Sequence, residues 1–125
     1  MSTRSAIIEK TANGFRGIYV HNDGYPEHNG RILAAHYTDP AKVSALIDLG
    51  DLSSLGEDIT PEHTFAYGRD RGEDGTEPLE RKTVSAVRKM IDHDYAYVFD
   101  GTTWTVNGKP LDEVLKKLKS KTTAK

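Results

Sequence analysis

The sequence predicts an α+β domain in which helices pack on one face of a mostly antiparallel sheet of about five strands. Two pairs of β-prone segments flank an Asn-Gly and an Asp-Gly dipeptide, which are typical of tight hairpin turns. Apolar residues recur at a spacing of three and four in four other segments, which indicates helices. The length of 125 residues fits one domain, expected at residues 1–119, followed by a flexible lysine-rich tail at residues 120–125.

The first hairpin is expected at residues 5–22, where Asn13-Gly14 separates two β-prone runs. Side chains alternate along a strand, so Tyr19 and His21 share one face of the second run. The turn cluster "DGYP", residues 23–26, is expected to end this strand.

Two helices are expected next. The period changes after Gly30, and a short helix should run to His36 or Tyr37. A second helix should begin at Asp39-Pro40, because aspartate is a favoured N-cap and proline is tolerated at the first helical position. Gly50 is the expected end of that helix.

The next segment mixes loop, strand and helix signals. Residues 51–63 are expected to be loop, and "TFAYG", residues 64–68, should form a third strand. The charged residues 69–78 contain two glycines and no apolar period, so they are expected to form a mobile loop. An apolar stripe predicts another helix over residues 79–92.

The last segment contains the second hairpin and a final helix. "YAYVF" and "TTWTV" flank Asp100-Gly101, and Trp104 within this hairpin is expected in the core. Apolar residues after Pro110 follow helical spacing. The predicted order of elements is therefore ββ–αα–β–α–ββ–α.

Composition excludes several classes of site and partner. The chain has no cysteine, so it has no disulfide, thiolate zinc site or cysteine nucleophile. Residues 116–125 carry five lysines and no acid, which leaves the rest of the chain with twelve basic and nineteen acidic residues. Nucleic acid is an improbable partner for such an acidic body. No apolar run suits a membrane span or a signal peptide, so a cytoplasmic protein is expected.

Residues 17–37 concentrate side chains that could carry chemistry: three of the five histidines, one aspartate and three tyrosines. His21, Asp23, His28 and His36 are ligand types that suit zinc, manganese or iron. The same four side chains could form a metal-free acid/base group, in which a carboxylate orients an imidazole. Their spacing does not match the strong helical metal signature of two histidines one turn apart.

A structural corner explains much of the same segment. Asp23 could accept hydrogen bonds from its own turn, and Gly24 could take a positive φ. His21 would hydrogen-bond across the sheet, while Tyr25 or Tyr37 would cover an edge of the core. A third interpretation is a binding pocket formed by these residues.

The charged loop offers one further candidate. Arg69 and Arg71 could hold an anion in a bidentate manner. Asp70, Glu73 and Asp74 lie beside these arginines, so neutralisation inside the loop is the competing interpretation.

The run "GIYVHNDGYPEHNGRILAAHY", with "KVSALIDLGDLSSLG", "RDRGE" and "YAYVFDGTTWTV", resembles a family of small proteins common in phages and prophages. The family pattern is Gly-Ile-Tyr-x-His-x-Asp-Gly-Tyr-Pro, a glycine before a helix that ends His-Tyr, and Leu-Gly-Asp-Leu-Ser. The resemblance covers residues 14–115 and implies a phage or prophage origin, and hence a location in the host cytoplasm, but no particular activity. Asn22 stands where tryptophan is common, so an aromatic stacking role there is not supported.

Two functions from different classes follow. The first is an accessory binding protein, without a cofactor, that docks on a host protein or takes up a small ligand through the residues named above. The second is a small hydrolase, with or without a metal, built on His21, Asp23, His28 and His36. Exposed sheet edges in a small α+β domain also make a homodimer plausible.

Overall fold

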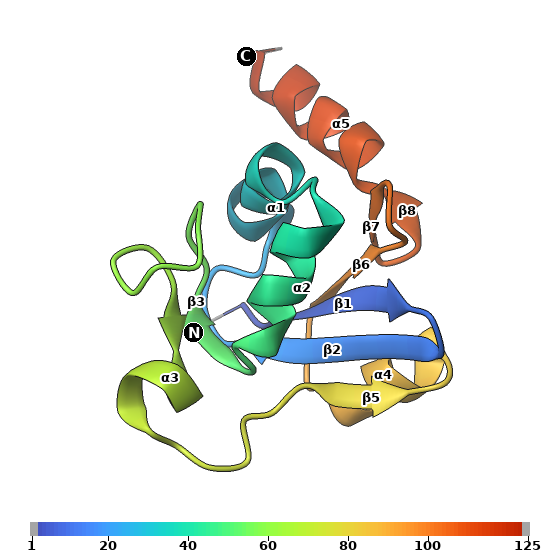
Figure 1. The fold of residues 1–125 in the computed structure, drawn as a ribbon. Coiled ribbons are helices and arrows are strands. Elements are labelled where there is room, and N and C mark those ends of the chain that lie inside the picture. The colour runs from blue at the N-terminus through green and yellow to red at the C-terminus, as the bar shows by residue number, and fades with distance from the viewer. Residues whose placement is uncertain (1–2, 124–125) are drawn as a thin grey trace.

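A computed structural model describes the backbone of residues 3–123 and the side chains of residues 3–118. Helices cover a single mixed sheet (Figure 1). The eight strands are β1 (Ser5–Thr11), β2 (Gly14–Val20), β3 (Leu52–Ser54), β4 (Phe65–Ala66), β5 (Leu79–Arg81), β6 (Tyr95–Phe99), β7 (Trp104–Val106) and β8 (Lys109–Pro110). The helices are the π-helix η1 (Pro26–Gly30), α1 (Arg31–His36), α2 (Pro40–Asp48), α3 (Tyr67–Arg71), α4 (Val84–Met90) and α5 (Leu111–Thr123).

The α+β class is confirmed, but the expected sheet of five mostly antiparallel strands is wrong in strand number and direction. The strands follow the order β4-β3-β2-β1-β6-β7-β8, and β5 also pairs with β2. The central strand β1 is antiparallel to β2 and parallel to β6, with Ser5 opposite Tyr95. A second parallel contact joins β2 to β3 through Val20 and Leu52. Hairpin turn dipeptides predict pairing only between strands that are adjacent in the sequence. They could not predict these parallel pairs between distant segments.

The helices cover both faces of the sheet, whereas a single covered face was expected. Alternation in β1 directs Ile7 to one face and Ile8 to the other, and both side chains are fully buried. Ile7 packs in a cluster with residues of α1, α2 and α5, on what we call the α2 face. Ile8 packs with Val87 of α4, on what we call the α4 face. A central strand that is apolar on both sides requires cover on both sides.

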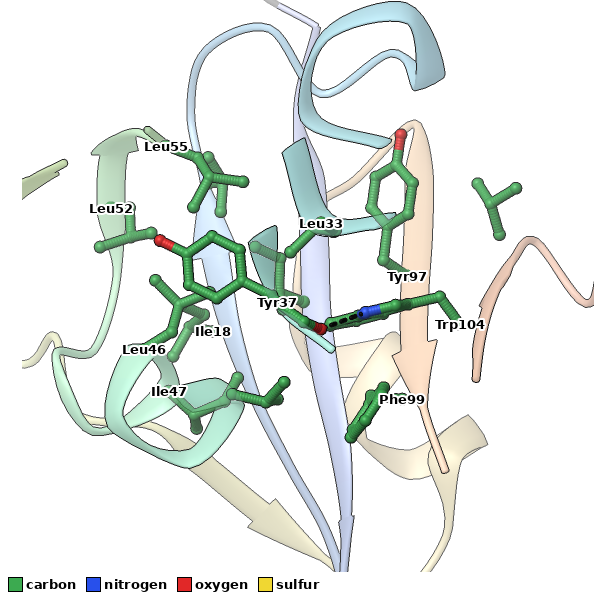
Figure 2. Packing of buried hydrophobic residues seen from close by; sticks show 14 of the residues in the cluster. Ile18, Leu33, Tyr37, Leu46, Ile47, Leu52, Leu55, Tyr97, Phe99 and Trp104 are labelled. Carbon is green, nitrogen blue, oxygen red and sulfur yellow. Dashed lines mark hydrogen bonds between the residues drawn. The ribbon is translucent and has the colours of Figure 1, made fainter. Parts of the chain in front are cut away.

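The α2 face holds the main core (Figure 2). Tyr37, directly after α1, is fully buried between the sheet and α2. Its backbone oxygen accepts a hydrogen bond of 2.8 Å from Nε1 of Trp104, drawn as the dashed line in Figure 2. Trp104 also lies with its ring centroid 5.0 Å from that of Phe99. The expectation that Trp104 belongs to the core is therefore confirmed.

Elements with strong local signals form as expected, with small shifts. The first hairpin closes through Ala12 and Asn13, one residue earlier than the expected Asn13-Gly14 turn, because Thr11 pairs with Gly14. Asp39 caps α2, since its side chain accepts a hydrogen bond of 3.0 Å from the amide of Ala41.

The region between the hairpins differs most from expectation. The expected loop at 51–63 contains β3, and the expected strand at 64–68 is reduced to β4 before α3 begins. The helix α3 also occupies the start of the charged loop 69–78. The expected helix at 79–92 is divided into β5 and α4, because Leu79 pairs with Gly17 of β2 and Thr83 caps a separate helix.

The C-terminal helix α5 extends away from the sheet (Figure 1). Its backbone continues to Thr123, into the segment 120–125 that was expected to be a flexible tail; residues 124–125 and the side chains from 119 onward lie outside the described part of the chain. Within residues 3–123, no helix has the length and apolar character needed to cross a membrane.

Candidate binding pocket

A cavity of about 340 Å³ opens at the end of β2 on the α4 face. We call it the carboxylate pocket. It lies where four segments meet: the end of β2, the turn before β3, the segment that leads into β5, and the end of α4. The residues that line it are Tyr19, Asp51, Gly75, Glu77, Leu79, Met90, Ile91 and Asp92.

One wall of the carboxylate pocket is apolar. Leu79 and Tyr19 belong to the partly buried side chains around the α4-face cluster, and Ile91 is a buried member of that cluster. Met90 has 58% of its surface exposed, the largest exposed fraction among the large apolar side chains of the described residues. A flexible thioether at the rim suits contact with a partner surface.

Asp51 is a polar member of the lining, and the local backbone fixes its position. Gly50 adopts the left-handed region with φ of +79°, which ends the turn after α2. The amide of Asp51 then donates a hydrogen bond of 2.8 Å to the oxygen of Thr76, and its own oxygen accepts one of 3.2 Å from Tyr67. The Asp51 side chain accepts a hydrogen bond of 3.0 Å from the amide of Tyr19. The carboxylate is therefore held between β2 and the segment that precedes β5.

The charge of Asp51 is not balanced by a neighbouring base. Burial raises the pKa of Asp51 above its ordinary value, the hydrogen bond from Tyr19 opposes this, and the charge of Glu77 raises the pKa further. Within the described residues, no arginine, lysine or histidine lies within ion-pair distance of Asp51 or Glu77. Asp92 differs, because its carboxylate pairs with Arg4 at 2.9 Å. The pocket thus holds two uncompensated carboxylates beside an apolar wall.

His21 is connected to this pocket through Tyr19. The hydroxyl of Tyr19 lies 2.7 Å from Nδ1 of His21, a side-chain contact within β2 and its end. The backbone amide of His21 donates a hydrogen bond of 3.0 Å to the oxygen of Leu52 in β3, so the expected hydrogen bond across the sheet is made by the backbone. Burial raises the pKa of Tyr19, while the nearby Arg4 guanidinium lowers it. Of the eight site residues expected from the sequence, His21 is the one with a described contact to a pocket-lining side chain.

Asp23, Tyr25 and His28 form a compact turn instead of a shared site. Asp23 itself takes the left-handed conformation, with φ of +57°, where Gly24 was expected to do so. The hydroxyl of Tyr25 donates to Asp23 at 3.3 Å, and its ring lies 6.2 Å from that of His28. His28 contacts the buried Asn29 at 2.9 Å. These local contacts agree with the structural-corner interpretation.

His36 and Tyr37 are adjacent in sequence but have different environments. His36 is exposed at the end of α1, with Nε2 at 3.9 Å from the carboxylate of Glu57. Tyr37 is in the core, and its hydroxyl donates a hydrogen bond of 2.9 Å to the oxygen of Gly56. Burial raises the pKa of Tyr37 to about 12.

Arg69 and Arg71 are neutralised within their own segment. Arg69 makes two hydrogen bonds to Asp70, at 2.9 and 3.0 Å, and others to the oxygens of Ile59 and Thr64. Arg71 pairs with Glu73 at 2.9 Å. This arrangement agrees with neutralisation inside the loop, because the donors of Arg69 are already directed at protein oxygens.

The metal alternative needs the four side chains His21, Asp23, His28 and His36 together, and the structure does not bring them together. Among the described residues, one group of three histidine or carboxylate side chains has ligand atoms within 4.8 Å of one another, and it consists of Glu57, Asp58 and His63. That group lies in the segment expected to be loop.

Neither of the two uncompensated carboxylates of the pocket, Asp51 and Glu77, was among the site residues expected from the sequence. Asp51 lies in the Leu-Gly-Asp-Leu-Ser run, which was the one available signal for it. Glu77 lies in the charged loop 69–78, where its neighbours carry charges of both signs and nothing distinguishes it.

Comparison of the chain with protein-family models, curated proteins and solved structures gives no match. The residues described above are therefore the basis for assigning a function.

Proposed function

We propose that the protein is an accessory binding protein whose carboxylate pocket receives a lysine or arginine side chain of a protein partner. The observation that carries this proposal is the partly buried carboxylate of Asp51 beside Glu77, without a basic partner among the described residues. A cationic group placed there would remove the repulsion between two like charges. It would also stabilise the ionised form of Asp51, which burial makes less favourable by removing water from the carboxylate.

The pocket also suits the rest of a long basic side chain. Lysine and arginine carry an apolar stem that packs along apolar surface while the charged end reaches a polar partner. Leu79, Met90 and Ile91 provide the apolar surface, and Asp51 and Glu77 provide the polar end. The cavity volume of about 340 Å³ falls in the lower range of ligand pockets, which is enough for one side chain.

Exposure at the rim favours a protein partner over a small free amine. A small amine would occupy the polar end and leave Met90 in water. A macromolecule that inserts a basic side chain would also cover Met90, which is 58% exposed. A host protein as partner fits the phage or prophage origin that the sequence resemblance implies.

The hydrolase alternative has weaker support. It requires His21, Asp23, His28 and His36 in one group, whereas Asp23 and His28 belong to a turn and His36 lies beside Glu57. No observation on those four residues favours catalysis over the turn contacts described above.

An NMR titration tests the proposed pocket directly. Capped lysine and arginine, each with acetylated N-terminus and amidated C-terminus, would be added to the ¹⁵N-labelled protein. Capped norleucine and citrulline serve as uncharged controls of similar size. We expect the two basic compounds to shift the amides of Gly75, Glu77 and Ile91, and the uncharged ones to leave them unchanged.

The matched variants are Asp51→Asn and Glu113→Gln. The amide that replaces the carboxylate in Asp51→Asn keeps an oxygen that can accept from Tyr19 and loses the charge, so this variant should abolish the shifts. Glu113 is an exposed acid on α5, outside the pocket, so Glu113→Gln should retain them. Equal shifts with norleucine, or shifts that persist in Asp51→Asn, would contradict the proposal.

A further inference from the structure

A second group of chemically capable side chains lies at the end of α1, where a loop between β3 and β4 passes close to it. This loop contributes Glu57, Asp58 and His63, and α1 contributes His36. None of these four side chains lines the carboxylate pocket. Any role that they have is therefore independent of the proposed function.

The Glu57 carboxylate faces an imidazole nitrogen with each of its two oxygens. Oε1 lies 3.8 Å from Nε2 of His63, and Oε2 lies 3.9 Å from Nε2 of His36. Both distances are longer than a hydrogen bond. Two ligands of one zinc ion in a tetrahedral site are separated by about 3.3 Å, given metal–ligand distances of about 2.0–2.1 Å. Among the described residues, the group whose ligand atoms already lie within 4.8 Å of one another is Glu57, Asp58 and His63, so His36 has to turn toward Glu57 to join it. The three side chains have room to move, because 41–56% of their surface is exposed.

The other nitrogen of His63 is held by a carboxylate. Nδ1 of His63 lies 3.1 Å from Oδ1 of Asp58, and the hydroxyl of Thr60 donates to the same oxygen at 2.5 Å. A proton on Nδ1 directed at Asp58 leaves the Nε2 lone pair available on the side of Glu57. Metal-binding histidines are oriented by a carboxylate in this way in many zinc sites.

The backbone of the loop is anchored on both sides of the group. Thr64, which is fully buried, donates a hydrogen bond of 2.6 Å to the oxygen of Asp58 and accepts one of 3.0 Å from the amide of Gly56. The hydroxyl of Tyr37 donates to the oxygen of Gly56. Lys42 donates to the backbone oxygen of Glu57 at 3.0 Å, which leaves the carboxylate of Glu57 to the histidines.

We infer that His36, Glu57 and His63 form a binding site for Zn²⁺ or a similar first-row divalent cation, with Asp58 as the residue that positions His63. Two imidazoles and one carboxylate form a ligand set that these cations prefer, whereas Ca²⁺ and Mg²⁺ favour oxygen ligands alone. Three protein ligands leave one further coordination position for water.

Cobalt(II) titration of the full chain, purified without an affinity tag and treated with chelator, tests this site. Tetrahedral Co²⁺ has visible absorption bands that octahedral aqueous Co²⁺ lacks, so the spectrum reports coordination and not only association. We expect saturation at one equivalent, reversal by one equivalent of Zn²⁺, and no effect of a large excess of Mg²⁺. An unchanged aqueous cobalt spectrum would overturn the inference.

Variants separate the ligands from adventitious histidine binding. His36→Ala, Glu57→Gln and His63→Ala should each weaken cobalt binding by at least about tenfold. Asp58→Asn should weaken it by about 10–100-fold, which is typical for the loss of a residue that orients a ligand. His93→Ala and Asp51→Asn are the controls, and both should bind as the unsubstituted chain does.

Glu57→Gln is the variant that should remove a ligand without disturbing the fold. The Glu57 side chain is exposed, and its described contacts are those with the two histidines, so the variant should retain the melting temperature of the apo protein. An undiminished cobalt spectrum in Glu57→Gln or in His36→Ala would overturn this ligand set. Loss of binding in His93→Ala alone would also overturn it.

Discussion

The two faces of the sheet differ in how many residues they bury and in whether their carboxylates have a basic partner. Within the described residues, sixteen buried residues gather on the α2 face and four on the α4 face. On the α2 face the buried carboxylate of Glu9 is paired with Arg16 at 2.6 Å and accepts a hydrogen bond from Ser44 at 2.7 Å. On the α4 face the carboxylate of Asp51 accepts one backbone hydrogen bond and has no base. Pairing offsets the cost of burying a charge, whereas the uncompensated carboxylate beside a cavity is the feature on which the proposed binding function rests.

The largest effect is expected where the α2 face is densest. Trp104→Ala removes a large buried side chain and leaves the backbone oxygen of Tyr37 without its indole donor. The free energy of unfolding should fall by about 3–5 kcal/mol, measured by urea denaturation. Trp104→Phe retains most of the volume and should cost less. A loss below about 1 kcal/mol in Trp104→Ala would mean that the α2 face is not the main source of stability.

The next effect tests charge compensation on the α2 face. Arg16→Met leaves Glu9, which is 5% exposed, without its ion-pair partner. We expect a loss of about 2–3 kcal/mol, at or just below the lower end of the range for a broken buried pair, because Arg16 is partly exposed. Arg4→Met is the matched control, since the Arg4–Asp92 pair is exposed and should contribute about 0–1 kcal/mol. Equal losses in the two variants would remove the contrast between the faces.

A smaller effect is expected at the thin contact between α4 and the sheet. A methyl group at Gly17 would lie 2.6 Å from Cγ1 of Val87 and 3.0 Å from Cγ1 of Ile8. Gly17→Ala should therefore push α4 away and cost about 1–3 kcal/mol. Val87→Ala removes the nearest atom, so the double variant should be more stable than the sum of the single effects predicts. Strict additivity in this cycle would show that the two residues do not share the contact.

The smallest change in stability is expected for Asp51→Asn, and its sign is the informative part. Because the pKa of Asp51 is raised in the folded state, the ionised carboxylate opposes folding at pH values above that pKa. This penalty is relieved as the pH falls through the folded pKa toward the ordinary value of about 3.9. Asp51→Asn should thus melt at the same or a higher temperature than the unsubstituted chain at pH 7, with a difference that shrinks on acidification. A lower melting temperature at pH 7 would indicate that the carboxylate stabilises the fold.

Local chemistry made part of this molecule predictable. The first hairpin, the Asp39 cap of α2 and the core position of Trp104 depend on residues close in sequence or on one strongly apolar side chain, and all three are confirmed. The separation of β5 from α4 was missed because Leu79 continues the apolar period of the helix. Only its pairing with Gly17 reveals a strand.

The candidate sites were less predictable for a physical reason. Residues 17–37 were predicted as a candidate site because histidines and tyrosines are close together in sequence. In the structure, a turn directs several of these side chains into local contacts. The residues that do meet come from distant segments: Asp51 and Glu77 in the pocket, and His36 beside Glu57. Their proximity depends on the packing of loops, which has no periodic signal in the sequence.

The parallel pairing of β1 with β6 has a consequence for synthesis on the ribosome. Ser5 lies opposite Tyr95, so the partner of the central strand is translated long after β1 and β2 have emerged as a hairpin. At about 5–20 residues per second, this interval lasts roughly 4–15 s. During that time one edge of the central strand remains unpaired and can associate with other nascent chains. Translation speed between the two hairpins is therefore expected to influence the yield of folded protein, and chaperones that shield extended apolar segments should bind β1 in this interval.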